Sequence, residues 1–256
     1  MSKPQMVLVA GWGQASEVLK PLAELLAPFA AVRTTSVYEL GQAQEAAGNN
    51  NAETPEPSSY AQQLADSELS DGPAVVLGWS MGAMVALEAA RAYPNLVRRL
   101  ILVSGCGSFC RRDGYPSGAS EASVAEMQRG LIDAPEATLR LFLSNVYRRT
   151  VTKELIAAKT TAALVLDRGE LTRGLEYLKT RDLRPVLPEV DQPTLIVHGQ
   201  LDRVIPIAAA EYLSEHLPHA EVQRFEQGVH GLCEQYPQEL QELIRGVLAD
   251  DEQPLH

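Results

Sequence analysis

A buried strand, a sharp turn and a helix follow one another around Ser80, and this succession constrains the fold more than any other stretch of the chain. Three apolar residues, Val75 to Leu77, predict a strand that is buried on both faces. The turn from Gly78 to Gly82 follows and has the pattern Gly-x-Ser-x-Gly. Good helix formers run from Met81 to Tyr93, and Pro94 ends the helix. A strand that turns directly into a helix in this way indicates an α/β sheet.

Ser80 is a candidate nucleophile, because a turn of this kind holds its serine in a strained backbone conformation above the sheet. Gly78 and Gly82 allow neighbouring chain to come close to the turn. The amide of Met81, at the helix N-terminus, is predicted to point at an anion that forms beside the Ser80 oxygen. The pattern alone is weak evidence. Together with the flanking strand and helix, it favours a catalytic serine over a structural turn serine.

The rest of the chain alternates apolar runs with helical patterns. Strands are predicted at 6–10, 31–37, 100–104, 193–198 and 220–225, and helices at 16–26, 60–67, 206–216 and 240–248. This alternation predicts a mostly parallel sheet with helices on both faces. Residues 41–59 have no periodicity and are predicted to form an exposed loop.

A second region interrupts this alternation after the strand at 100–104. Helical patterns run from residue 121 to about residue 180 with no apolar strand among them. We expect a helical cap at 108–184 that is inserted between two core strands and covers the site. Residues 1–107 and 185–256 would then form the α/β core.

Composition argues against several kinds of partner. The net charge of −11 argues against a broad nucleic-acid surface, and no apolar run approaches the roughly 18 residues of a membrane helix. The start of the sequence shows no secretory signal pattern, and an odd number of cysteines (Cys106, Cys110 and Cys233) is typical of reduced thiols. We therefore expect a cytoplasmic monomer that needs no metal and no cofactor.

The loops after the last two predicted strands supply partners for the serine. A serine hydroxyl needs a base within hydrogen-bond reach, and a third group must orient that base. Asp202 and then His230 follow successive strand ends, and the ends of parallel strands converge on one edge of a sheet. His198 is too near Asp202 in the sequence to be its partner, and Asp191 precedes its strand and would lie at the wrong edge. The predicted catalytic residues are Ser80, Asp202 and His230.

The loop Gly11-Trp12-Gly13 follows the first strand, where an enzyme of this build supplies a second oxyanion amide. We predict that the Trp12 and Met81 amides form the oxyanion hole; the alternative for Trp12 is a tight turn with a packing tryptophan. The predicted reaction is attack of Ser80 on an ester carbonyl, with formation and hydrolysis of an acyl-enzyme.

The segment 137–166 carries five basic residues and one acidic residue, a local charge of +4. The basic residues are Arg140, Arg148, Arg149, Lys153 and Lys159. Charge alone favours a solvated helix face over a docking patch for an acidic partner. Phe142, Leu143 and Val146 share this segment and either line an acyl channel or pack the cap.

Several of these motifs recur together in one family. They are Gly11-Trp12-Gly13, the turn at 78–82, the segment 109–116 with Arg112-Asp113, Phe142-Leu143, the segment 174–184 and Gly199-Gln200-Leu201-Asp202. Over nearly the whole chain they resemble the pimeloyl-[acyl-carrier protein] methyl ester esterases of biotin synthesis, which are α/β-hydrolases. Segment 174–184 is the most specific part. The chain begins with the strand at 6–10, which precedes Trp12, so its sheet should lack the family's leading hairpin strands.

The resemblance implies a substrate and a partner. The substrate would be the methyl ester of a pimeloyl chain on an acyl-carrier protein, and the basic residues of 137–166 would then dock the acidic carrier. Substrate contacts would fall on Trp12, Met81, Phe142, Leu143, Ser144, Asn145 and Val146. A general small-acyl carboxylesterase or thioesterase with the same triad is the alternative, and a non-catalytic binding protein of the same fold is a third hypothesis.

Overall fold

A parallel six-stranded sheet forms the centre of the molecule in the computed structural model, which describes residues 3–42, 56–148 and 150–251. The strands are β1 (Gln5–Ala10), β2 (Ala31–Ser36), β3 (Ala74–Trp79), β4 (Val97–Val103), β5 (Thr194–Gly199) and β6 (Ala220–Phe225). Their order is β2-β1-β3-β4-β5-β6, and every neighbouring pair is parallel. The predicted parallel sheet without leading hairpin strands is confirmed for the described residues.

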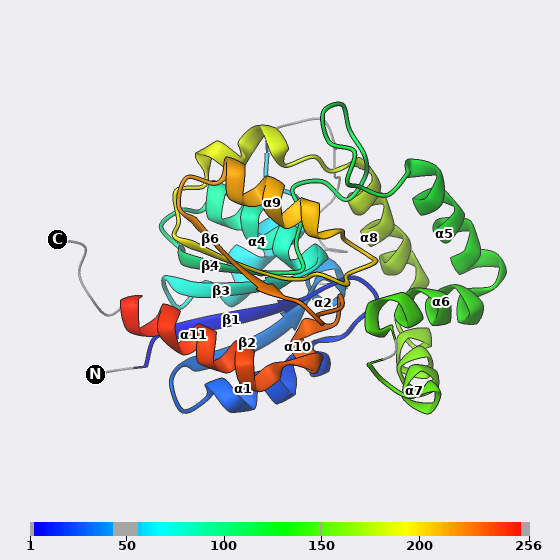
Figure 1. The fold of residues 1–256 in the computed structure, drawn as a ribbon, viewed down its shortest axis with the longest axis horizontal. Helices are drawn as coiled ribbons and strands as arrows, with labels where there is room; N and C mark the ends of the chain where they lie inside the picture. Colours follow the sequence, from blue (N-terminus) through cyan, green and yellow to red (C-terminus); the bar gives the residue numbers. More distant parts are fainter. Residues whose placement is uncertain (1–2, 43–55, 149, 252–256) are drawn as a thin grey trace.

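Helices cover both faces of the sheet (Figure 1). On one face, α1 (Lys20–Leu26) packs against α11 (Pro237–Asp251), with α10 (Leu232–Gln235) beside them. On the other face lie α4 (Met81–Ala92) and α9 (Ile207–His216). Shorter helices complete this layer: α2 (Val37–Gln42), α3 (Ser59–Gln63), a π-helical turn (Leu64–Glu68) and a 3-10 turn (Arg184–Glu189). The central strand β3 and nearly all of α4 are buried, which explains the continuous apolar run in β3.

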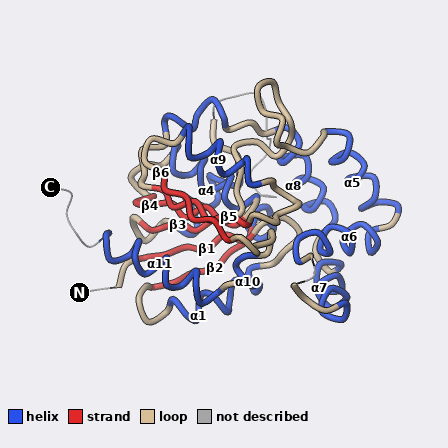
Figure 2. Tube along the Cα trace, viewed as in Figure 1, coloured by secondary structure: helices blue, strands red, loops and turns tan. Residues whose placement is uncertain are grey.

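Four further helices lie between β4 and β5 in the sequence. They are α5 (Glu121–Asp133), α6 (Pro135–Tyr147), α7 (Lys153–Leu164) and α8 (Arg168–Thr180). Ser120, Thr152 and Asp167 cap the N-termini of α5, α7 and α8, and each side chain accepts a hydrogen bond from a backbone amide. The four helices gather beyond the carboxyl ends of the strands, where no strand accompanies them (Figure 2).

Several predicted boundaries differ from the structure. The helix expected at 16–26 consists of a 3-10 turn (Ser16–Leu19) followed by α1, because Pro21 has no amide hydrogen for a bond in a continuous α-helix. Val37, expected in a strand, begins α2, and Gly41, expected in a loop, lies within that helix. Gln42 ends α2 and Ser59 begins α3, and within the expected loop residues 43–55 lie outside the described residues. Pro206 precedes α9 in extended conformation instead of occupying its first turn.

Candidate active site

The turn between β3 and α4 places Ser80 in a backbone conformation that few L-residues adopt, with φ 60° and ψ −120°. Glycine is required on both sides of it. A Cβ atom on Gly78 would lie 2.4 Å from the Gly82 carbonyl oxygen, and one on Gly82 would lie 2.3 Å from the Val9 carbonyl oxygen. The Ser80 amide donates to the Val103 carbonyl at 2.9 Å, which ties the turn to β4. The predicted sharp turn is therefore present, and both glycines are sterically required.

The structure brings Ser80, His230 and Asp202 together. The Ser80 Oγ lies 2.9 Å from His230 Nε2, and His230 Nδ1 lies 2.8 Å from Asp202 Oδ2. All three residues are buried. With its Nδ1 proton donated to the carboxylate, the imidazole presents the Nε2 lone pair to the serine hydroxyl, which is the arrangement that a general base requires.

The second carboxylate oxygen of Asp202 is held by the backbone. Oδ1 accepts hydrogen bonds from the Val204 amide at 2.8 Å and the Ile205 amide at 2.9 Å. Burial by itself raises the pKa of this carboxyl, but the His230 and His198 imidazoles and these hydrogen bonds outweigh burial and hold the pKa of Asp202 below its ordinary value. Asp202 therefore carries a negative charge at neutral pH and fixes the tautomer of His230.

His198 contacts the same carboxylate, which the sequence did not indicate. Its Nε2 lies 2.8 Å from the Ile205 carbonyl oxygen and 3.5 Å from Asp202 Oδ2. Burial lowers the pKa of His198, so the ring is neutral and its Nε2 proton is donated to the Ile205 carbonyl. His198 thus fixes the loop whose amides hold Asp202. The only sequence signal for this role was its place at the end of a strand.

Two side chains that the sequence analysis did not single out fix the backbone of His230. The Trp79 indole donates to the His230 carbonyl at 2.8 Å, and the Ser104 hydroxyl donates to the same oxygen at 3.2 Å. Ser104 is the second non-glycine residue with positive φ, 49°, among the described residues. In addition, the Gly231 amide donates to the Val146 carbonyl at the end of α6, at 3.1 Å. The histidine loop is therefore fastened both to the sheet and to α6.

The predicted oxyanion amides lie beside the serine. Met81 is the first residue of α4, and the loop of Trp12 passes so close that a Cβ atom on Gly11 would lie 2.8 Å from Ser80 Cβ. Within the described ranges, neither the Trp12 amide nor the Met81 amide donates to a backbone carbonyl. Both amides therefore have a donor to offer an anion at Ser80, and their role stays a prediction.

The side chain of Trp12 packs against the helices between β4 and β5. Its Nε1 donates to the Leu171 carbonyl in α8 at 2.7 Å. Its ring meets Phe142 of α6 edge to face, with ring centroids 4.8 Å apart. The predicted packing role of Trp12 and its predicted place beside the serine are thus compatible.

The other predicted substrate residues divide between two sides of α6. Leu143 and Val146 are buried and Phe142 is half-buried. Ser144 and Asn145 are exposed, and the Ser144 hydroxyl donates to the carbonyl of its own helix at Arg140. Because each α-helical residue turns by about 100°, Ser144 lies on the opposite side of α6 from Phe142. The structure therefore does not bring Ser144 to the Trp12 loop.

The predicted docking residues differ in their exposure and in their partners. Arg140, near Glu136 at 3.8 Å, and Lys153 are exposed, Arg148 is half-buried, and Arg149 lies outside the described residues. Lys159 instead forms an internal ion pair, with its Nζ 2.6 Å from Glu234 Oε1 and 4.5 Å from the centre of the Tyr147 ring. We therefore correct the prediction for Lys159, because its charge is neutralised by a residue that follows the His230 loop.

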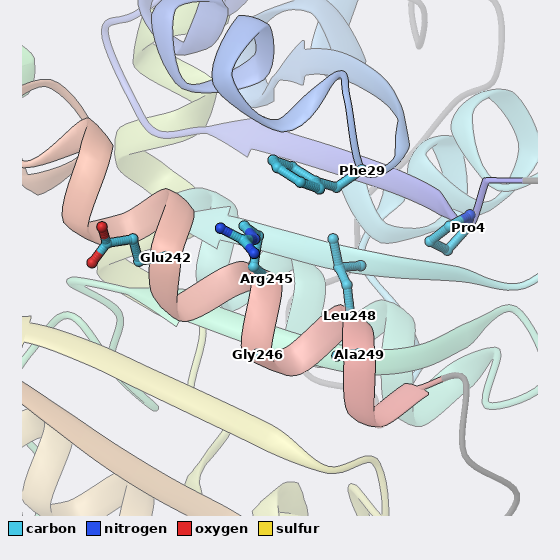
Figure 3. Close-up of a pocket in the computed structure, with 7 residues that line it drawn as sticks. All are labelled: Pro4, Phe29, Glu242, Arg245, Gly246, Leu248 and Ala249. Carbon is cyan, nitrogen blue, oxygen red and sulfur yellow. The ribbon is translucent and has the colours of Figure 1, made fainter.

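A surface pocket of about 570 Å³ lies away from this site (Figure 3). Its lining residues are Pro4, Phe29, Glu242, Arg245, Gly246, Leu248 and Ala249. Pro4 precedes β1, so the pocket lies at the amino end of that strand, whereas Ser80 lies at the carboxyl end of the sheet. In addition, no helix in the described ranges has the length and apolarity to cross a membrane.

A parallel sheet with a serine on a strained strand-to-helix turn, followed along the chain by Asp202 and His230, defines an α/β hydrolase. The model of the Alpha/beta hydrolase family matches residues 6–242. The solved structure of an esterase from Exiguobacterium antarcticum superposes with a TM-score of 0.81 at 20% sequence identity, covering 97% of this chain and 93% of that one. The chain belongs to the Alpha/beta hydrolase family.

Two curated relatives of this chain have the same name. The pimeloyl-[acyl-carrier protein] methyl ester esterase of Aromatoleum aromaticum is 33% identical over 97% of this chain and 99% of the relative. The protein of the same name from Nitrosomonas europaea is 27% identical over 92% of each chain. The resemblance predicted from the sequence motifs is confirmed.

Proposed function

We propose that this chain is a serine carboxylesterase that hydrolyses the methyl ester of pimeloyl-[acyl-carrier protein] in biotin synthesis. The observation that carries the proposal is the continuous hydrogen-bonded chain from the Ser80 Oγ through His230 to Asp202, at 2.9 Å and 2.8 Å. The relatives that match 97% and 92% of the chain support the choice of substrate.

The mechanism follows from this geometry. His230 Nε2 takes the Ser80 proton as the oxygen attacks the ester carbonyl, and Asp202 stabilises the imidazolium that forms. The Trp12 and Met81 amides hold the oxyanion of the tetrahedral intermediate. His230 returns the proton to the leaving methoxide, so methanol departs and an acyl-enzyme remains. Water then attacks the acyl-enzyme with His230 as base, and the free carboxylic acid and Ser80 are released.

The proposal divides the chain into a core of residues 1–107 and 185–256 and a helical cap of residues 108–184. The two points where the chain crosses between them are adjacent, which supports this division. The Leu183 amide donates to the Gly107 carbonyl at 2.7 Å, and Ser108 pairs with Asp182 as an antiparallel bridge. Within the cap, α6 and α8 pack against Trp12 and so cover the site.

The carrier protein is the proposed partner, and the cap is its proposed docking surface. Arg140 and Lys153 offer exposed positive charge in a chain of net charge −11. Leu141, next to Arg140 in α6, and Leu155, in the first turn of α7, are exposed apolar side chains. Exposed cationic and apolar side chains on these helices suit an acidic protein partner better than they suit a small ester.

A general small-acyl esterase or thioesterase with the same triad is the second candidate. It is favoured by the internal ion pair of Lys159, which removes one charge from the docking surface. Charge reversal separates the two functions. Arg140→Glu with Lys153→Glu should lower kcat/KM for the carrier-linked ester at least about tenfold while sparing p-nitrophenyl esters, and Lys20→Glu, at an exposed position of α1, is the control. Equal rates for all variants would favour the second candidate.

Growth without biotin tests the whole proposal. A strain that lacks its own esterase should grow without biotin when it carries this chain and should not grow when it carries the Ser80→Ala variant. If neither soluble protein supports growth, the biotin assignment fails. Covalent labelling of Ser80 by a fluorophosphonate separates this outcome from a non-catalytic protein, because labelling requires an activated serine.

A further inference from the structure

Gly174, in the middle of α8, contacts the side chains of both residues whose amides are proposed to hold the oxyanion. A Cβ atom added at Gly174 would lie 2.6 Å from Trp12 Cδ1, 3.2 Å from Trp12 Nε1 and 3.7 Å from Met81 Sδ. Optimal contact between carbon atoms is about 3.5–4 Å. The indole therefore packs directly on the helix backbone, and it can do so only because residue 174 has no side chain.

Two further contacts enclose the Trp12 indole. One turn before Gly174, the Leu171 carbonyl accepts the indole proton at 2.7 Å, and this bond is buried. On the other side, the Phe142 ring meets the indole at an interplanar angle of 84°. The side chain is thus held between α8 and α6, and it has no room to yield to an added methyl group.

The backbone of Trp12 must follow its side chain, because the loop that carries it is tight. Gly13 has φ +72°, and Gly11 lies so close to Ser80 that a Cβ atom there would be 2.8 Å from the serine Cβ. A displacement of the indole is therefore transmitted to the Trp12 amide, which lies beside the reacting oxygen.

We propose that Gly174 is a positioning residue for the oxyanion hole, and that α8 sets the position of the Trp12 amide relative to the Met81 amide. The inference rests on the proposed esterase function. The atoms nearest to a Cβ at Gly174 belong to Trp12 and Met81, so we expect its effect to pass through Trp12. A misplacement of about 1 Å can cost on the order of 10²-fold in rate, and the oxyanion forms only in the transition state. The loss should therefore appear in kcat and not in KM.

The test compares Gly174→Ala with Gly246→Ala, a matched helical substitution in α11 where a Cβ atom meets nothing within 4 Å. With p-nitrophenyl butyrate, Gly174→Ala should lower kcat on the order of 10²-fold and change KM less than about threefold. The affinity for a trifluoromethyl ketone, which forms a tetrahedral oxyanion adduct on serine, should fall by the same factor as kcat. Gly246→Ala should match the wild type in all three.

A second variant and an NMR spectrum distinguish a local displacement of Trp12 in Gly174→Ala from a general folding defect. Trp12→Phe removes the donor to Leu171 without adding volume and should show the same loss in kcat. The chain has two tryptophans, so the ¹⁵N–¹H spectrum contains two indole signals. In Gly174→Ala the Trp12 signal should shift and the Trp79 signal should stay.

An unchanged Trp12 signal, or a kcat no lower than that of Gly246→Ala, would overturn the inference. A wild-type protein that hydrolyses no ester and resists fluorophosphonate would instead refute the proposed function. The indole spectrum would still decide, in that case, whether Gly174 positions Trp12.

Discussion

Replacing Asp202 with asparagine tests how the carboxylate acts on His230. Asp202 Oδ1 accepts from two backbone amides, while Oδ2 faces His230 Nδ1. In Asp202→Asn the remaining oxygen is held by the two amides, so the NH₂ group faces Nδ1 and donates to it. The imidazole must then carry its proton on Nε2, where it cannot accept the proton of Ser80.

The size of the effect follows from the alternative orientation. Turning the amide over would restore the tautomer but would set the NH₂ group against two amide donors. Each donor left without an acceptor costs about 1–3 kcal/mol, so the turn costs about 2–6 kcal/mol. At about 1.4 kcal/mol per factor of ten, acylation should slow by between about 30-fold and about 10⁴-fold.

Single-turnover release of p-nitrophenol measures the acylation rate directly. The matched control is Asp191→Asn, because Asp191 is an exposed aspartate that lies 3.2 Å from His219, away from the serine; this variant should acylate at the wild-type rate. If Asp202→Asn kept more than about a third of the wild-type rate, or if both variants slowed equally, the tautomer argument would be wrong.

Three further predictions concern stability. Gly82→Ala should lower the free energy of unfolding by about 1–3 kcal/mol in urea titrations, because its Cβ would lie 2.3 Å from a backbone oxygen of β1; an unchanged midpoint contradicts this. Burial raises the pKa of Asp182, but the hydrogen bonds and charge of Arg184 outweigh burial and lower it. The stability that Asp182 contributes is thus present above its unfolded pKa. The difference in free energy of unfolding between the wild type and Asp182→Asn should therefore shrink as the pH falls from about 4 to about 2; a difference that does not change with pH contradicts this. Lys159→Met should lower the free energy of unfolding by about 1–3 kcal/mol, because it removes the cation that pairs with Glu234. It should change kcat/KM for carrier-linked and small esters by the same factor; a selective loss with the carrier-linked ester would restore the docking role of Lys159.

The sequence predicted what depends on local pattern and chain order. Continuous apolar runs indicated the inner strands β1, β3, β4 and β5, because inner strands of a parallel sheet are buried on both faces. The order of Ser80, Asp202 and His230 predicted that the three side chains lie together, because the ends of parallel strands converge, and they are joined by hydrogen bonds. Helix 16–26 was predicted as one element because periodicity does not register the amide hydrogen that Pro21 lacks.

The sequence could not indicate contacts that exist only once the chain is folded. His198, Trp79 and Ser104 act through backbone carbonyl groups, which no residue pattern reveals. Lys159 was assigned to a surface because its neighbours in the sequence are basic, whereas Glu234 lies 75 residues further along the chain. A charge count over one segment omits such partners.

The bond between the Gly231 amide and the Val146 carbonyl has a mechanical consequence for the reaction. A displacement of α6 would therefore pull on the backbone one residue after His230. The hydrogen bonds from Trp79 and Ser104 to the His230 carbonyl would oppose such a displacement of the histidine. The main chain from His230 to Gly231 thus connects α6, through the Gly231 amide, with the sheet, through the His230 carbonyl.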